Sequence, residues 1–180
     1  MTERSLRVAR LALFAALTLV LCYVESTIVL PVTIPGVKLG LANVAVLIAL
    51  YLMGPRWALG IMILKVLVIS FFVGAPSMML YSLAGSALAF VGMLAAWKLD
   101  LFGIVATSVL SAILHNAGQL LMAMALMHTT AILINLPVML IAACVMGTLT
   151  GSVAAGVLKA LPAITQAGAS KHRFPAKRRA

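Results

Sequence analysis

Long apolar segments separated by short breaks dominate the pattern along the chain. Six such segments cover residues 6–30, 39–53, 57–73, 78–97, 101–127 and 131–158. Each is continuously apolar rather than alternating, and most approach the roughly 20 residues that a helix needs to cross a bilayer core. The breaks carry turn-forming residues, as in LPVTIPGVK, GPRW and GAPS. The pattern therefore predicts an all-α membrane protein, a bundle of six helices.

Composition supports lipid as the solvent of this bundle. Of the 180 residues, 64% are hydrophobic and 9% are charged, whereas soluble domains carry about a quarter charged residues. Helices satisfy their backbone hydrogen bonds within one segment, and continuous apolar runs do not fit the alternating strands of a membrane barrel. The segment 39–53 is short, so it is expected to tilt or to be completed by the preceding loop.

The distribution of basic residues predicts the orientation. The chain has 13 Lys and Arg against three Asp and Glu. If the N-terminus is cytoplasmic, all basic residues except Lys38 and Lys65 lie on the cytoplasmic side, as the positive-inside rule requires. We therefore expect both termini in the cytoplasm. Residues 1–160 would form the membrane domain and residues 161–180 a basic, disordered tail that attracts anionic lipid, with no nucleic-acid role expected.

Polar residues inside the apolar segments are the candidate functional residues, because such groups are costly and rare in hydrocarbon. Most fall in the outer half of the predicted bundle, which favours a cavity open to the outside. We predict that eight residues bind substrate: Glu25, Lys38, Asn43, Lys65, His115, Asn116, Gln119 and Asn135.

The segment 101–127 presents the clearest polar face. Ser108, Ser111, His115 and Gln119 are spaced three, four and four residues apart, which places them in one stripe of a helix. For the two serines, hydrogen bonds between helices are the favoured interpretation. For His115, Asn116 and Gln119, ligand contact is favoured. No metal site or cofactor is expected, because His115 has no second His or carboxylate at ligand spacing.

Lys65 has two interpretations, because it lies too deep to reach either membrane surface easily. It either has a structural role within the protein or meets an anionic substrate. Lys38 and Glu25 are predicted at similar heights near the outer mouth, where residues 31–40 would form a lid over the site.

Small residues at four-residue spacing mark faces where helices approach closely. Ala12 and Ala16 form one such face, and Gly147 and Gly151 form another. Packing within the chain is expected for the two glycines.

Three stretches carry a family resemblance: PGVKLGLANVAVLIALYLMGP, ALGIMILKVLVISFFVG and LHNAGQLLMA. Over residues 11–158 the chain resembles the heptaprenyl diphosphate synthase component I family, also called the Gx transporter family. It is similar as well to the substrate-binding S components of energy-coupling factor transporters. That resemblance implies a six-helix bundle with an outer ligand site, in the cytoplasmic (inner) membrane of a bacterium as a multi-pass protein. It also implies that Ala12 and Ala16 dock a transmembrane coupling protein that a pair of ATPases drives.

The acidic residues argue against catalysis of prenyl chain elongation. Such chemistry needs clustered Asp residues that hold magnesium on a diphosphate, but the chain has only Glu3, Glu25 and Asp100, which are predicted in different places. Neither a Ser-His-acid pattern nor a Gly-rich phosphate loop is present in the sequence. The protein is therefore expected not to be an enzyme.

Two functions remain open. The first is a substrate-binding membrane component that captures a small vitamin-like or anionic metabolite outside and relies on the coupling protein and ATPases for energy. The alternative is a non-catalytic membrane accessory protein of prenyl diphosphate or quinone metabolism, or of membrane electron transfer.

Overall fold

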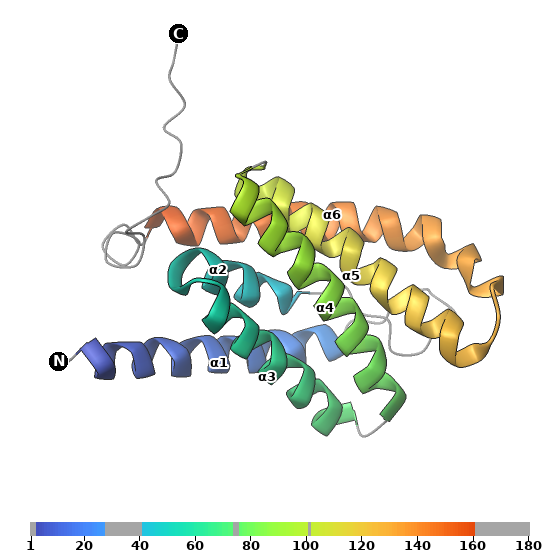
Figure 1. The fold of residues 1–180 in the computed structure, drawn as a ribbon, viewed down its shortest axis with the longest axis horizontal. Helices are drawn as coiled ribbons and strands as arrows, with labels where there is room; N and C mark the ends of the chain where they lie inside the picture. Colours follow the sequence, from blue (N-terminus) through green and yellow to red (C-terminus); the bar gives the residue numbers. More distant parts are fainter. Residues whose placement is uncertain (1–2, 28–40, 74–75, 101, 161–180) are drawn as a thin grey trace, which may run out of the picture.

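The computed structural model describes residues 3–27, 41–73, 76–100 and 102–160 (Figure 1). These ranges contain six α-helices and one short 3₁₀ helix, and no strand lies within them. The α-helices are α1 (Glu3–Thr27), α2 (Asn43–Met53), α3 (Pro55–Val73), α4 (Pro76–Leu99), α5 (Ile104–Met127) and α6 (Leu136–Ala160), and the 3₁₀ helix is η1 (Ala131–Asn135). The predicted all-α architecture is confirmed. Lys38, the predicted lid and the basic tail lie outside the described residues.

Proline and glycine set several of these boundaries. Pro55 and Pro76 are the first residues of α3 and α4, and Pro137 lies in the first turn of α6. Proline fits there because the first helical N–H groups have no partner within the helix. Between α2 and α3 the backbone of Gly54 has φ +88°, a conformation that glycine adopts without a steric penalty. This turn lets α3 follow α2 directly.

Successive helices alternate in direction, with α1, α2 and α6 close to the long axis of the molecule and α3 and α4 inclined to it (Figure 1). As a result, α1 begins and α6 ends at the same end, toward which the α2–α3 and α4–α5 connections also point. This end carries the exposed residues Arg56, Lys98 and Lys159, and we call it the basic end. The opposite end, where α5 turns into η1, is called the far end. The start of α1 and the end of α6 therefore lie together at the basic end.

The helices differ in how well they qualify as membrane spans. Among the residues that the structure describes, three regions are long and apolar enough to cross a bilayer: Met79–Leu99, Ile104–Met127 and Ala131–Ala160. The apolar part of α1 covers only Leu11–Glu25, because its first turns carry three arginines. The 11-residue α2 is also short.

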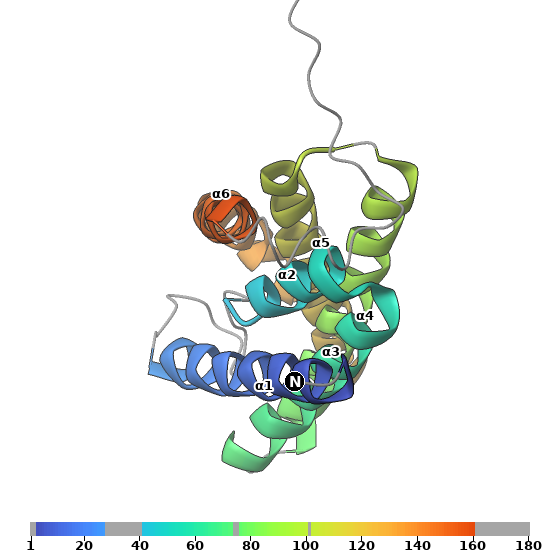
Figure 2. The same ribbon diagram turned by 90° about the vertical axis from the view of Figure 1, so that its left-hand side faces the viewer.

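Helix α2 is short because it is enclosed by protein. Every residue from 42 to 50 is buried. Helix α2 contacts all five other α-helices: α1, α3, α4, α5 and α6. Figure 2 shows α2 in the middle of the bundle, between α1 and α6. A helix surrounded by protein does not need the full length that lipid exposure demands.

Helices α5 and α6 approach each other closely at glycine. A Cβ atom added to Gly147 would lie 2.7 Å from Val109 Cα, and one added to Gly151 would lie 2.8 Å from Val105 Cα. Ser108 and Thr150 share a hydrogen bond of 3.1 Å across the same interface. The predicted packing of both glycines within the chain is confirmed, and so is the predicted hydrogen bond between helices at Ser108.

The outer surface is apolar. Large hydrophobic side chains are exposed on several helices, including Leu13 on α1, Ile63 on α3, and Ile141 and Val145 on α6. A soluble protein rarely exposes so continuous an apolar surface, whereas lipid chains cover it without cost. Together with the three spans, this surface identifies a helical membrane bundle.

The two ends give a topology prediction. In a background with Cys22 and Cys144 replaced by alanine, Lys98→Cys at the basic end should react with a membrane-impermeant thiol reagent only in inverted vesicles. His128→Cys at the far end should react in intact cells. Labelling of both positions from the same side would contradict the six-pass arrangement.

Candidate functional site

Lys65 is buried in the interior of the bundle. Its side chain is 1% exposed and is the largest of the fully buried side chains. The ammonium donates to Asn43 Oδ1 at 2.7 Å and to Ser86 Oγ at 3.3 Å. A lysine from α3 thereby joins the first residue of α2 to the middle of α4. The Lys65 side chain therefore connects three helices in the interior of the bundle.

Glycine brings α4 and α5 into close contact beside this lysine. A Cβ atom on Gly118 would lie 2.6 Å from Ala84 O, and one on Gly85 would lie 2.8 Å from His115 O and from Gln119 Cγ. It would also lie 2.9 Å from His115 Cε1. The missing side chains at Gly85 and Gly118 therefore make room for His115 and Gln119 against α4.

Polar side chains gather on the buried face of α5. Ser111, His115, Asn116 and Gln119 are all buried, near the middle of the 24-residue helix. Asn116 Nδ2 donates to the carbonyl of Met139 at 2.8 Å, which connects α5 to α6. The polar face predicted from the sequence is therefore directed into the bundle.

Several buried polar atoms here have no hydrogen-bond partner among the described residues. They are Asn43 Nδ2, Ser82 Oγ, Ser111 Oγ, His115 Nδ1, Asn116 Oδ1 and Gln119 Oε1. Nearly all buried polar groups in proteins are paired, so such a group of unpaired atoms needs an explanation. The lack of a partner for Ser111 also contradicts the hydrogen bond between helices expected for it.

We use the name polar core for the buried polar residues of α2 to α5 described above. They are Asn43, Lys65, Ser82, Ser86, Ser111, His115, Asn116 and Gln119. Five of the eight residues predicted to bind substrate are among them. Sequence reasoning missed Ser82 and Ser86, although their spacing with Gly85 on α4 places all three on one helix face.

The other predicted residues lie as follows. Glu25, buried near the end of α1, accepts the backbone N–H of Ala42 at 3.4 Å, directly beside Asn43. Asn135, also buried, donates to the carbonyl of Ile132 at 3.2 Å within η1. Glu25 therefore adjoins the polar core through α2, whereas Asn135 lies in the connection before α6.

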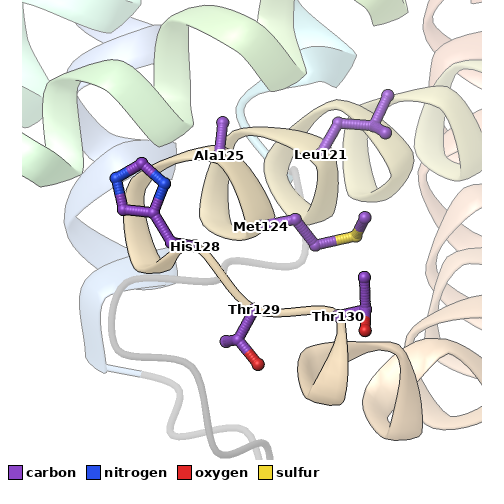
Figure 3. Close-up of a pocket in the computed structure, with 6 residues that line it drawn as sticks. All are labelled: Leu121, Met124, Ala125, His128, Thr129 and Thr130. Atoms are coloured by element: carbon purple, nitrogen blue, oxygen red, sulfur yellow. The ribbon is translucent and has the colours of Figure 1, made fainter.

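A separate hollow opens on the surface at the far end. It has a volume of about 580 Å³ and is lined by Leu121, Met124, Ala125, His128, Thr129 and Thr130 (Figure 3). Figure 3 shows these side chains around the turn that follows α5. No residue of the polar core lines this hollow, and its openness to the surface distinguishes it from the buried cluster.

The remaining predictions concern partner and metal binding. Ala12 and Ala16 are both exposed on α1, so their small side chains face outward from the bundle. Across the described ranges, no three His, Cys, Asp or Glu residues come together as a metal site. The polar core therefore offers hydrogen-bonding groups and one lysine rather than a cluster of metal ligands.

Comparison with known proteins identifies the family. Neither the curated proteins nor the solved structures include a match to this chain. The family model described as heptaprenyl diphosphate synthase component I matches residues 14–157. The match covers all of α2 to α5 and nearly all of α6, including every residue of the polar core. The chain therefore belongs to the heptaprenyl diphosphate synthase component I family.

Proposed function

We propose that this protein is the substrate-binding membrane component of an uptake system for a small polar metabolite. It captures the molecule on the outer side of the bacterial cytoplasmic membrane, which it crosses several times. The polar core holds the molecule, and the far end faces outward. The arrangement is similar to that of S components of energy-coupling factor transporters.

The observation that carries this proposal is the set of unpaired polar atoms in the polar core. Six polar atoms from α2, α4 and α5 are buried without a partner in the described part of the chain. Leaving a buried donor or acceptor unsatisfied costs about 1–3 kcal/mol each. A bound polar molecule would offset this cost, which is why a cluster maintained in the interior favours ligand binding over a purely structural role.

We further propose that the protein is not an enzyme and obtains energy from partners. Its three acidic residues, Glu3, Glu25 and Asp100, belong to different parts of the chain. A transmembrane coupling protein and a pair of ATPases would supply the driving force. The exposed alanines of α1 are the proposed docking face, since small residues allow another helix to approach closely.

Tryptophan substitutions test the docking face. Ala12→Trp and Ala16→Trp should each reduce co-purification of the coupling protein by at least tenfold, because the large indole keeps the partner helix away. Leu149→Trp, at an exposed position of α6, is the matched control and should have no effect. The readout is quantitative mass spectrometry of proteins captured with the tagged chain. Normal association and uptake of both alanine variants would reject the docking assignment.

The family membership favours one alternative. A non-catalytic accessory subunit of prenyl diphosphate or quinone metabolism, or of membrane electron transfer, would also be a membrane protein without catalytic acids. It would use the polar core for an amphiphile, or only its surface for docking. This alternative predicts co-purification with a soluble synthase or redox protein, and no uptake defect when the gene is deleted. The transporter proposal predicts the opposite for both measurements.

A further inference from the structure

The hollow at the far end lies where a membrane span meets the turn that follows it. The span Ile104–Met127 ends one residue before His128, and the hollow extends from Leu121 to Thr130 (Figure 3). At a rise of about 1.5 Å per residue, Leu121 lies about 9 Å deeper along α5 than Met127. The hollow therefore crosses the boundary between the hydrocarbon of the bilayer and its polar surface.

The two halves of this hollow differ in chemistry. The half on α5 is lined by Leu121, Met124 and Ala125, whose spacing of three and four residues places them on one face of the helix. These side chains offer only apolar contact. The half at the turn is lined by a histidine and two threonines, which supply the polar groups. The lining thus changes from apolar to polar in the same direction as the membrane around it.

The polar half offers hydrogen-bond donors. Thr129 Oγ1 accepts the backbone N–H of Ala131 at 3.2 Å, so its O–H remains to donate to another group. The hydroxyl of Thr130 and the ring N–H of His128 belong to exposed residues and are donors as well. None of the described residues that line the hollow is acidic. A group rich in acceptor oxygens therefore fits this half better than a cation.

Neither water nor a hydrocarbon chain alone suits the whole hollow. Water against Leu121 and Met124 leaves apolar surface hydrated, and a chain against the threonines leaves donors without acceptors. The volume of about 580 Å³ lies within the range of about 300–1,000 Å³ that small-molecule sites occupy. An amphiphile with its polar group at the turn and its chain along α5 satisfies both halves.

We propose that the hollow binds one phospholipid of the surrounding bilayer. Its phosphodiester group lies at residues 128–130, and the start of one acyl chain lies along Leu121 and Met124. A phosphodiester brings acceptor oxygens and a negative charge, and charge-assisted hydrogen bonds are about twice as strong as neutral ones. The bilayer presents such a lipid with its headgroup already at the height of the turn. This site is separate from the polar core, and the inference does not rest on the proposed function.

A photoreactive phosphatidylglycerol with a diazirine in its acyl chain tests the site. The full chain is purified in dodecyl maltoside, a detergent without phosphate, and labelled peptides are identified by mass spectrometry. Residues 121–130 should be labelled several times more strongly than residues 138–145 of α6, whose apolar side chains are also exposed. Unlabelled dioleoyl-phosphatidylglycerol should compete roughly tenfold better than dioleoylglycerol, which lacks the phosphate that the donors bind.

Two substitutions at exposed positions probe the two halves separately. Ala125→Trp fills the apolar half and should abolish the preferential labelling. Ala95→Trp, at an exposed alanine of α4, is the matched control and should be labelled like the wild-type protein.

Thr130→Val removes one donor from the polar half and keeps the shape of the side chain. The Thr130 side chain makes no capping hydrogen bond to η1, so the turn should be retained. The advantage of phosphatidylglycerol over dioleoylglycerol should fall at least threefold in this variant, while competition by dioleoylglycerol stays the same.

Each part of the proposal has a result that overturns it. Equal labelling of residues 121–130 and 138–145, or unchanged labelling of Ala125→Trp, shows that no lipid is bound specifically at the hollow. Equal competition by dioleoylglycerol and phosphatidylglycerol, or an unchanged preference in Thr130→Val, overturns the phosphodiester assignment. None of these measurements involves uptake, so their failure and the failure of the proposed function are independent.

Discussion

Gly118→Val is expected to lower the free energy of unfolding by about 1–3 kcal/mol and to abolish ligand retention. A Cβ atom at this position would lie 2.6 Å from the backbone oxygen of Ala84. Backbone cannot move aside as a flexible side chain can, so α4 and α5 must separate. The separation would also shift His115 and Gln119, which lie against Gly85 on the same interface.

Gly156→Val is the matched control for this substitution. Gly156 lies within α6, and an added Cβ meets no heavy atom within 4 Å. The same change of residue in a helix should therefore leave stability and ligand retention nearly unchanged. Both variants are compared by denaturant titration in detergent and by mass spectrometry of the retained molecule. Equal behaviour of the two would show that close packing of α4 on α5 does not maintain the site.

The hydrophobic pattern predicted the helices because their boundaries depend on local residues. The breaks at GPRW and GAPS mark the ends of helices, and prolines begin the helices that follow. The alternating direction of six helices then places the start of α1 and the end of α6 at the same end of the bundle. These features need no knowledge of which side chains meet, which is why sequence alone was sufficient.

The partners of Lys65 were not predictable in the same way. The sequence placed Lys65 deep in its apolar segment but did not identify Asn43 and Ser86, to which the ammonium donates. Asn43 is the first residue of α2, which lies inside the bundle. No local sequence pattern shows that this helix is enclosed by the others. A serine in an apolar helix is also a weak signal of a site, because its hydroxyl can hydrogen-bond to a backbone carbonyl of its own helix.

The two serines of α5 illustrate the same limit. Ser108 and Ser111 belong to one stripe of the helix and were given one interpretation. Ser108 bonds to Thr150 across the α5–α6 interface, whereas Ser111 is buried without a partner in the part of the chain that the structure describes. Helical spacing shows which residues share a face, but only the neighbouring helices decide what each residue meets.

His115→Ala is expected to reduce uptake of the proposed substrate at least tenfold while the protein still inserts. The ring is 2% exposed and its Nδ1 atom has no partner among the described residues. The substitution removes a group that the polar core directs inward, and one buried hydrogen bond to a charged ligand is worth about 1.5–3 kcal/mol, which corresponds to roughly ten- to a hundredfold in affinity. Asn116→Ala should have a similar effect and also leaves the Met139 carbonyl without its donor.

His128→Asn provides the histidine control, since His128 is exposed at the far end and lies outside the polar core. Asparagine tolerates the left-handed backbone of this residue, where φ is 49°, so the turn after α5 should be retained. Uptake is measured in cells that produce equal amounts of each variant in the membrane. If His115→Ala and His128→Asn transport equally well, the buried histidine serves packing and the polar core is not the binding site. A selective loss in His115→Ala and Asn116→Ala would instead connect uptake to these two neighbouring residues of the polar core, each of which has a buried unpaired atom among the described residues.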